Sequence, residues 1–340
     1  MCIRDRTIKV RRWSEANHNI LIIGLLIILG LIYSFFKSFK NDVPRKIIEA
    51  KYAKSESTFI TLDNGSRIHT LVKGNPDGPV LVLLHGYLAS LFTFDKVVPQ
   101  LSEKYKVVCL DFPAFGLTGA VPNKDYSIES FIETVNQVVK KLSIDKFYLL
   151  GHSMGGRVAW RYAIKYPDQV KKLILVGSGV LLNEGDLERF ERQNIPKAFR
   201  YIGANFPYKE KFVYFTPKFF AKQGAKVSVY DQNLVTDEMV DQYYDLPLLE
   251  GSRQALADMA LMNEVKDLLL DDENLLKQIK VPSLMIHGDK DNIIGLWATK
   301  PFENNINNLK IKIFTNMGHM PMIEDPIGVV KEINDFIKID

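Results

Sequence analysis

Gly151-His152-Ser153-Met154-Gly155 is the stretch from which the fold of this chain can be deduced. It follows an apolar run, Phe147–Leu150, that predicts a strand, and it precedes a helix-forming run, Gly156–Tyr166. A G-x-S-x-G motif between a strand and a helix is typical of a sharp turn that lifts a serine above the edge of a sheet. A serine hydroxyl is a weak nucleophile until a base takes its proton. The motif therefore predicts Ser153 as a nucleophile and requires a base and an acid elsewhere in the chain.

Apolar runs on either side of this motif predict a mostly parallel sheet, because strands that helices cover on both faces are apolar throughout. These runs are Val80–Leu84, Lys106–Leu110, Phe147–Leu150, Lys172–Val176, Ser283–His287 and Lys310–Phe314. Further predicted elements are the hairpin strands Ser57–Leu62 and Arg67–Val72 and the helices Ile128–Leu142 and Ile327–Ile337. The sequence thus predicts a doubly wound α/β core made of residues 57–177 and 281–340.

Residues 178–280 interrupt this alternation with helical, aromatic-rich sequence. A stretch of this length is not an ordinary loop, so we expect a helical cap inserted between two strands of the sheet. Within it, residues 200–226 carry many basic side chains between aromatic rings and only one acid, Glu210. Two interpretations stay open: rings that pack on the core beneath solvated lysines, or a cap face that rests on anionic lipid.

The base is predicted at His319, in the segment Asn316–Pro321 that follows the last predicted strand. From that loop an imidazole can reach back to Ser153. The other histidines are given structural interpretations, because they lie beside the apolar N-terminal run, on the hairpin, beside loops with other tasks or at a strand end. They are His18, His69, His85, His152 and His287.

The acid is predicted at Asp291, in His287-Gly288-Asp289-Lys290-Asp291, directly after a predicted strand. This gives the order Ser, Asp, His along the chain. Asp289 is the lesser candidate. The position after the preceding strand offers Gly177 and Ser178, which are not acidic. The acid would fix the tautomer of the histidine and stabilise its cation.

Two backbone N–H groups are predicted to stabilise an oxyanion. One belongs to Met154, directly after the nucleophile, and the other to Tyr87, in the loop after Val80–Leu84. The sequence has no Cys/His cluster and no glycine-rich phosphate loop, so it implies neither a metal nor an organic cofactor.

The N-terminal part predicts a membrane anchor. No residue from Ala16 to Phe36 is formally charged, and residues 20–36 are almost wholly apolar. A helix of about 20 such residues spans the roughly 30 Å hydrocarbon core of a bilayer. We therefore expect a basic tail at 1–19, a transmembrane helix at 20–36 and a polar juxtamembrane linker at 37–56.

A cleaved signal peptide and a buried core helix are the competing interpretations of this run. It ends in Phe35-Phe36-Lys37, without the small residues of a cleavage site. Basic residues flank it on both sides, which disfavours a core helix. They are almost balanced between the two sides, so the short tail before the span decides in favour of an exported C-terminal domain.

The distribution of charge excludes a nucleic-acid-binding surface. Residues 1–56 carry a net charge of +6, so the rest of the chain carries −2 out of a total of +4. Nucleic-acid binding needs its basic side chains on the folded domain. Of the two cysteines, Cys109 lies in an apolar run and is expected to be a small core residue.

Together these motifs resemble the α/β-hydrolase superfamily, in the branch with a helical cap, over residues 57–338. The matching segments are His85-Gly86, Asp111-Phe112-Pro113, Gly151–Gly156, Gly288–Asp291, Gly318-His319 and Glu324-Asp325-Pro326. A span before such a domain resembles membrane-anchored esterases and monoacylglycerol lipases. One departure is Ala114, where members of the superfamily commonly have glycine, and it predicts an altered path for that loop.

The serine nucleophile and the resemblance imply hydrolysis of carboxylic esters, such as acyl glycerols or medium-chain esters, through an acyl-enzyme. The expected partners are the ester substrate and a lipid bilayer. Carbon–carbon hydrolysis, acyl transfer and perhydrolysis with the same triad remain alternatives. Members that cleave carbon–carbon bonds usually carry a Ser-Gly-Pro-Gly stretch where this chain has Tyr87-Leu88-Ala89-Ser90. A binding protein without chemistry is the remote alternative, because no predicted triad member is missing.

Overall fold

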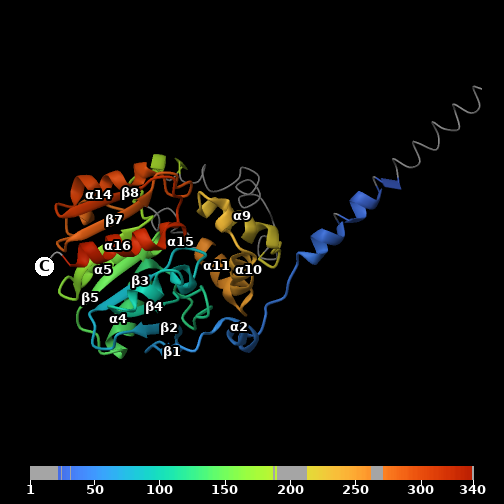
Figure 1. The fold of residues 1–340 in the computed structure, drawn as a ribbon. Helices are drawn as coiled ribbons and strands as arrows, with labels where there is room; N and C mark the ends of the chain where they lie inside the picture. Colours follow the sequence, from blue (N-terminus) through green and yellow to red (C-terminus); the bar gives the residue numbers. More distant parts are fainter. Residues whose placement is uncertain are drawn as a thin grey trace, which may run out of the picture.

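A single eight-stranded sheet organises the protein. The computed structural model describes residues 22–23, 25–30, 32–186, 188–189, 213–261 and 271–338 (Figure 1). The strands are β1 (Ser57–Thr61), β2 (Arg67–Gly74), β3 (Val80–Leu84), β4 (Lys106–Leu110), β5 (Phe147–His152), β6 (Val170–Val176), β7 (Ser283–Gly288) and β8 (Leu309–Phe314). Their order in the sheet is β1-β2-β4-β3-β5-β6-β7-β8. The pairs β1–β2 and β2–β4 are antiparallel and all other pairs are parallel, which confirms the predicted mostly parallel sheet.

Helices cover both faces of this sheet. They are α2 (Arg45–Tyr52), α3 (Val98–Leu101), α4 (Ile128–Lys141), α5 (Met154–Lys165), α14 (Lys300–Asn305), α15 (Pro321–Glu324) and α16 (Pro326–Ile337). Alternate residues of β3 point to opposite faces: Val82 packs in the cluster that contains α4, α5 and α14, and Leu83 packs in the cluster that contains α3 and α16. Because both faces are buried, the central strands are apolar along their whole length.

The last strand departs from this pattern. Lys310 to Ile313 are exposed in β8, although the apolar run predicted a strand buried on both faces. The physical reason is its place at the edge of the sheet, where β7 is its one neighbour. Alternating Lys and Ile residues also keep charge on this edge, which hinders pairing with another chain.

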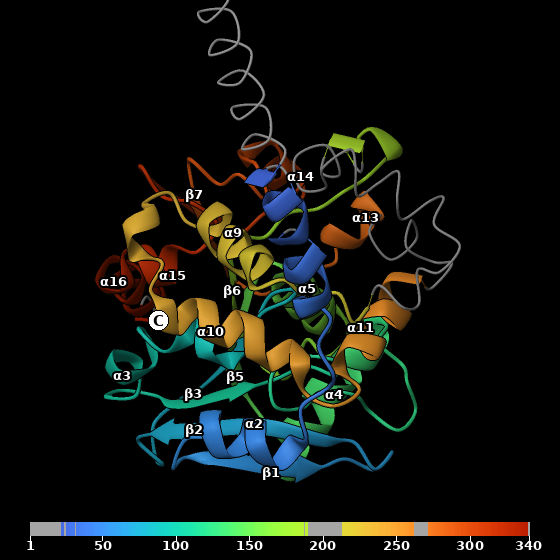
Figure 2. The same ribbon diagram turned by 90° about the vertical axis from the view of Figure 1, so that its right-hand side faces the viewer.

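The segment between β6 and β7 carries the predicted helical insertion. Its described helices are α9 (Lys218–Ser228), α10 (Asp237–Asp245), α11 (Ser252–Leu261) and α13 (Glu273–Leu276), with short 3-10 turns at Gln232–Leu234 and Leu246–Leu248. Residues 200–212 of the basic, aromatic stretch 200–226 lie outside the described residues. Figure 2 shows α9 and α10 in front of the sheet, on the side where the N-terminal segment joins the body.

The end of this insertion is fixed to the core by a buried carboxylate. Asp271 accepts hydrogen bonds from Arg157 (Nε to Oδ2, 3.0 Å) and from Arg161 (Nη2 to Oδ1, 2.6 Å), both on α5. The Asp271 side chain is almost fully buried. A buried carboxylate that lost these arginines would be strongly destabilising, so this ion pair ties the returning chain to the helix that follows Ser153.

The N-terminal helix projects from the body. Residues 22–23, 25–30 and 32–37 are helical, and Figure 1 shows this segment in blue, pointing away from the sheet. The predicted span 20–36 lies partly outside the described residues. Within the described part of the chain, no helix combines the length and apolar character needed to cross a membrane.

The stretch 37–56, predicted as a polar linker, is packed on the body and contains α2. Phe39 forms a β-bridge with Phe215, and Val43 forms one with Leu249. The Asp42 carboxylate accepts hydrogen bonds from Arg253 Nε (3.0 Å) and from a backbone N–H of the cap (2.9 Å). We call residues 38–52 the strap. It connects the projecting helix to the cap and the core, so it is not a free spacer.

Candidate active site

The turn after β5 presents Ser153. Its φ and ψ angles are 53° and −120°, a strained conformation for a serine, and its N–H donates to Val176 O at 2.9 Å. A Cβ added at Gly151 would lie 2.2 Å from Gly155 O, and one at Gly155 would lie 2.3 Å from Leu84 O. Both glycines are therefore required by close backbone contacts, as the G-x-S-x-G motif predicts. The serine stands at the carboxyl end of β5, at the start of α5.

A buried acid–imidazole pair lies at the neighbouring strand ends. His319 Nδ1 and Asp291 Oδ2 are 2.7 Å apart, and both side chains are buried. Asp291 Oδ1 also accepts the N–H groups of Ile293 and Ile294, each at 2.8 Å. Burial by itself raises the pKa of Asp291, but His319 and these N–H groups outweigh it and hold that pKa below its ordinary value. Asp291 is thus an ionised acceptor, and His319 carries its proton on Nδ1.

The imidazole of His319 lies close to the end of β6, the strand whose Val176 O accepts the Ser153 N–H. Gly177 directly follows Val176, and a Cβ added there would lie 3.3 Å from His319 Nδ1 and 3.4 Å from Cε1. His152, next to Ser153, donates Nε2–H to His319 O at 3.0 Å. The structure therefore joins Asp291 and His319 directly and places Ser153, 166 positions before His319, at a neighbouring strand end. Among the described residues, no hydrogen bond joins the Ser153 hydroxyl to the His319 ring.

Asp289 does not contact this pair in the structure. Its carboxylate accepts the N–H of Asn316 at 2.6 Å and lies 3.3 Å from Lys290 Nζ. Of the two acids that sequence reasoning left open, Asp291 is the one at His319. Asp289 instead fixes the loop that follows β8.

The predicted oxyanion donors lie beside Ser153. Ala89 N–H donates to Gly86 O at 3.3 Å, which closes a turn with Tyr87 inside it. A Cβ added at Gly86 would lie 3.0 Å from Ser153 Cβ, so this turn packs against the serine. Among the described residues, the N–H groups of Tyr87 and Met154 have no hydrogen-bond acceptor. The Tyr87 ring packs edge-on against Phe115, with ring centroids 5.6 Å apart.

Two histidines given structural interpretations border the pair. His287 Nε2 donates to Ile294 O at 2.7 Å and lies 3.3 Å from Asp291 Oδ2. Burial lowers the pKa of His287, and burial lowers that of His152 to about 3. Both rings are therefore neutral, and they shape the surroundings of Asp291 and His319 without adding charge. The spacing of His287 and Asp291, four residues apart across a strand end, is the signal that could have indicated this contact.

A second histidine–aspartate pair is buried away from Ser153. His69 Nδ1 donates to Asp111 Oδ2 at 2.7 Å, and His69 Nε2 lies 2.8 Å from Ser57 Oγ. Asp111 also accepts the N–H groups of Leu91 (2.7 Å) and Leu117 (2.8 Å). It joins β2 to the loops after β3 and β4, in agreement with the structural interpretation of His69.

Ala114, the departure from the superfamily pattern, keeps the loop in a left-handed conformation. Its φ is 76°, a value that glycine adopts without strain and alanine does not. The altered path of the loop stays a prediction, and the structure shows that the alanine accepts the strained backbone. Ala114 is buried and lines the pocket described next.

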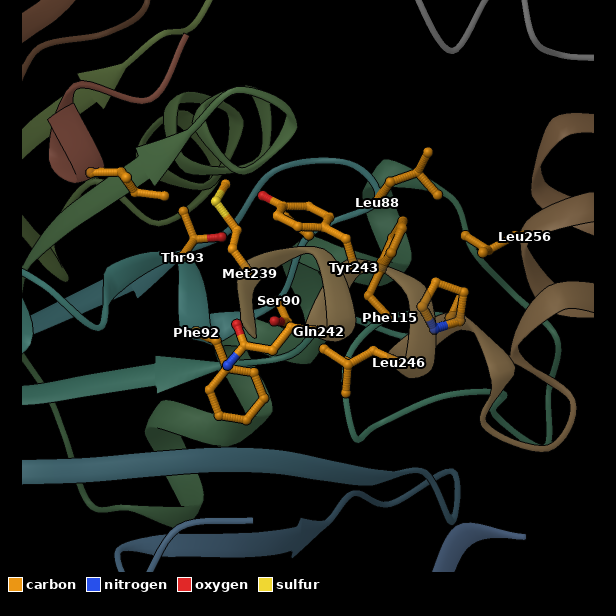
Figure 3. A pocket seen from close by; sticks show the side chains of 15 residues that line it. Leu88, Ser90, Phe92, Thr93, Phe115, Met239, Gln242, Tyr243, Leu246 and Leu256 are labelled. Carbon is orange, nitrogen blue, oxygen red and sulfur yellow. The ribbon is translucent and has the colours of Figure 1, made fainter. Parts of the chain in front are cut away.

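A pocket lies between cap residues such as Met239 and Tyr243 and the loops that carry Leu88 and Phe115 (Figure 3). Its volume of about 50 Å³ is enough for a few non-hydrogen atoms, since one water needs roughly 10–15 Å³. The lining includes Leu88, Phe115, Met239, Tyr243, Leu246 and Ile323. Tyr243 O–H lies 3.6 Å from the sulfur of Met320, the neighbour of His319. Burial raises the pKa of Tyr243 to about 12, so this hydroxyl stays neutral.

Comparisons with known proteins agree with this arrangement. A family model described as the alpha/beta hydrolase fold matches residues 79–326. The chain is 27% identical over 278 residues to a 2-hydroxy-6-oxo-2,4-heptadienoate hydrolase of Pseudomonas putida, covering 80% of this chain and 92% of that protein. It is 26% identical over 261 residues to the human monoacylglycerol lipase ABHD6, covering 76% and 75%.

Solved structures show the same fold. A bacterial membrane phospholipase A superposes with a TM-score of 0.68 at 22% identity, covering 94% of this chain and 98% of that one. The sheet order, the strained serine turn and the family model over residues 79–326 all lead to one conclusion. The chain belongs to the alpha/beta-hydrolase fold family.

Proposed function

We propose that this hydrolase cleaves carboxylic esters with Ser153 as nucleophile, His319 as base and Asp291 as the orienting acid. The observation that carries the proposal is the 2.7 Å contact of His319 Nδ1 with the buried, ionised Asp291, beside the strained turn of Ser153. Because Asp291 keeps the proton of His319 on Nδ1, Nε2 is the nitrogen that takes the proton of Ser153.

The expected reaction has two steps. Ser153 Oγ attacks the ester carbonyl while His319 takes its proton, and the N–H groups of Tyr87 and Met154 stabilise the oxyanion. His319 then gives that proton to the leaving alcohol, which departs and leaves an acyl-enzyme. Water attacks the acyl group with His319 again as base, which releases the acid and restores the serine.

We infer that the pocket, whose lining includes neither Ser153 nor His319, receives the acyl part of the substrate, and its lining then favours ester hydrolysis over carbon–carbon hydrolysis. The relatives include both a lipase and a hydrolase of a dienoate, so similarity alone does not choose. None of the described residues that line the pocket is charged. An acyl chain needs no charge, whereas an anionic dienoate would lose its hydration without a cationic partner. Carbon–carbon hydrolysis is the second candidate.

We also propose that residues 20–36 anchor the enzyme in a bilayer, with the hydrolase domain exported. The apolar side chains of the described helical residues 22–37 have exposed fractions from 43% to 68%. Phe35 packs on Phe215 with ring centroids 5.2 Å apart, but about half or more of the surface of most of these side chains is not covered by the described part of the protein. The strap holds the base of this helix against the cap, where Phe219 and Phe220 are exposed beside Lys222. This arrangement supports a cap that faces anionic lipid.

Hydrolysis of p-nitrophenyl esters of increasing chain length tests the reaction. Wild type is expected to turn over these esters and Ser153→Ala is not. Equal rates in both proteins would contradict ester hydrolysis by Ser153. Cleavage of a dienoate by wild type, abolished in Ser153→Ala, would favour the second candidate.

The anchor is tested by a protein without residues 1–37. It should leave the membrane fraction, and retention at wild-type level would contradict the proposal.

A further inference from the structure

The carboxylate of Glu324 connects the loop of His319 to the cap. Glu324 is the last residue of α15, five positions after His319. Its Oε1 accepts the N–H of Gly318 at 2.7 Å. Its Oε2 accepts the N–H of Tyr230 at 2.8 Å and that of Asp231 at 3.4 Å, two and three residues after the end of cap helix α9. One side chain therefore binds the backbone of the histidine loop with one oxygen and the backbone of the cap with the other.

Two further contacts hold these same segments together. His319 N–H donates to Ser228 O, the last residue of α9, at 2.9 Å. A Cβ added at Gly318 would lie 2.7 Å from Tyr230 N and 2.8 Å from Val229 C. The backbone of the histidine loop thus touches the end of α9 directly, and Figures 1 and 2 both place α9 next to α15. We call these contacts the cap clasp: Gly318, His319 and Glu324 on the core side, and Ser228, Tyr230 and Asp231 on the cap side.

Glu324 has the acceptor groups that are needed to bind two backbone segments at once. A carboxylate accepts hydrogen bonds on both oxygens, while a neutral amide accepts on one and offers N–H to the other. Gly318 is buried, so its N–H would lose its partner if Glu324 were removed. None of the described salt bridges involves Glu324, so its bonds go to backbone N–H groups rather than to a cation.

We propose that Glu324 is a positioning residue: through the cap clasp it holds the His319 imidazole in its catalytic orientation only while the end of α9 is seated on the core. The inference rests on the proposed function of His319 and adds a route by which cap movement changes the rate. If α9 lifts, His319 loses a backbone acceptor at Ser228, and the carboxylate loses the N–H groups at its cap end. Glu324 itself does not contact the reacting atoms.

Glu324→Gln tests this inference with the smallest change of shape. The amide keeps one side of the clasp and cannot accept on both, so we expect kcat to fall about 10- to 100-fold, with KM within about twofold, because a small misplacement of a base costs this much. Asp325→Asn is the matched control. Asp325 caps α16 by accepting Gly328 N–H at 2.9 Å and has no part in the clasp, and asparagine is an equally good cap. Its kcat should remain within about twofold of wild type.

A double variant separates positioning from general structure. In a His319→Ala background, Glu324→Gln should lower the residual rate no further, because the group that it positions is gone. An equal loss in both backgrounds would overturn the inference and leave the role of His319 intact. If His319→Ala itself kept wild-type activity, the proposed function would fail first, and the two failures are thereby distinguished.

Hydrogen exchange of the whole protein gives a readout that does not depend on activity. Peptides that cover 228–231 and 316–322 should both exchange faster in Glu324→Gln than in Asp325→Asn, since their N–H groups share one acceptor. Faster exchange in only one peptide, or in neither, would overturn the clasp. An unchanged melting temperature is not required for this comparison, because both peptides are measured against the core strands of the same sample.

Discussion

Two histidine–aspartate pairs in this protein have the same hydrogen-bond length and different surroundings. His319–Asp291 and His69–Asp111 each place Nδ1 at 2.7 Å from a buried carboxylate oxygen. Both aspartates accept two backbone N–H groups as well, and both have a serine nearby. The first pair lies at the carboxyl edge of the parallel strands, and the second lies between the antiparallel strand β2 and the loops after β3 and β4.

The two pairs differ in the backbone conformation of the serine that lies near each of them. Ser153 stands in a strained turn with φ of 53°, beside the N–H groups of Tyr87 and Met154, which have no acceptor in the described part of the chain. Ser57 starts the regular edge strand β1, its N–H donates to Lys54 O, and its Oγ accepts Lys54 N–H. Ser57 thus lies in regular strand backbone, and its own N–H already has an acceptor. On the function that we propose, a histidine–aspartate pair alone is not enough to make a nucleophile, because the turn and the oxyanion donors are also needed.

The largest expected effect separates the two serines. Ser153→Ala should lower kcat for ester hydrolysis by roughly 10⁴- to 10⁶-fold, because the acyl-enzyme no longer forms. Ser57→Ala should leave kcat within about twofold and cost about 1 kcal/mol of stability, since a hydrogen bond to His69 is lost. Steady-state kinetics with p-nitrophenyl esters and urea unfolding check both. A large loss of kcat in Ser57→Ala would mean that Ser57 and the His69–Asp111 pair take part in the reaction.

The second largest effect on kcat is expected at Asp291, the carboxylate of the first pair. Asp291→Asn is expected to lower kcat by roughly 10³- to 10⁴-fold, since an amide cannot hold His319 in the tautomer that leaves Nε2 free. The fold should persist, because the side chain keeps its shape. Circular dichroism and kinetics of the same sample check this, and an Asp291→Asn enzyme with wild-type kcat would assign the orienting role elsewhere.

Breaking the second pair should affect stability rather than rate. His69→Ala leaves the Asp111 carboxylate buried without its imidazole partner, which costs about 3–5 kcal/mol. The free energy of unfolding in urea measures this loss. Once corrected for the folded fraction, kcat should stay within a few-fold of wild type. A fully stable His69→Ala protein with a collapsed kcat would reverse the roles that we assign to the two pairs.

The smallest expected effect is on the free energy of unfolding at low pH. Burial raises the pKa of Asp111, but His69 and the N–H groups outweigh it and hold that pKa below the ordinary 3.8. A depressed carboxyl pKa stabilises the folded state at pH values above the unfolded-state pKa, and this contribution is lost as the pH falls through the folded-state value. Unfolding free energies measured from pH 7 down to pH 3 should therefore fall more steeply below about pH 4 in wild type than in Asp111→Asn. Parallel curves would contradict the assignment.

The central sheet could be predicted from the sequence for a local reason, and the residues that we propose for the site at its carboxyl edge come from short local motifs. Apolar runs place β3, β4 and β5 within a residue or two of their bounds, because strands buried on both faces leave no polar positions. The order Ser153, Asp291, His319 follows from motifs that each occupy a few neighbouring residues. These features need no knowledge of which segments meet in space.

The features that the sequence did not reveal depend on contacts between distant segments. Arg253 binds Asp42 across more than 200 residues, and nothing local to either residue marks that pair. Glu324 and Tyr230 are likewise far apart in the chain. The exposed side of β8 also escapes a local analysis, since its position at the sheet edge is decided by topology.

Labelling with a fluorophosphonate tests the central claim most directly, since this reagent bonds to a serine that a neighbouring base activates. Intact mass and peptide mapping of the wild-type protein should give one adduct, on the peptide that contains Ser153, and none on the peptide that contains Ser57. Ser153→Ala should remain unlabelled under the same conditions. An adduct on Ser57, or labelling of Ser153→Ala at the wild-type rate, would contradict the account.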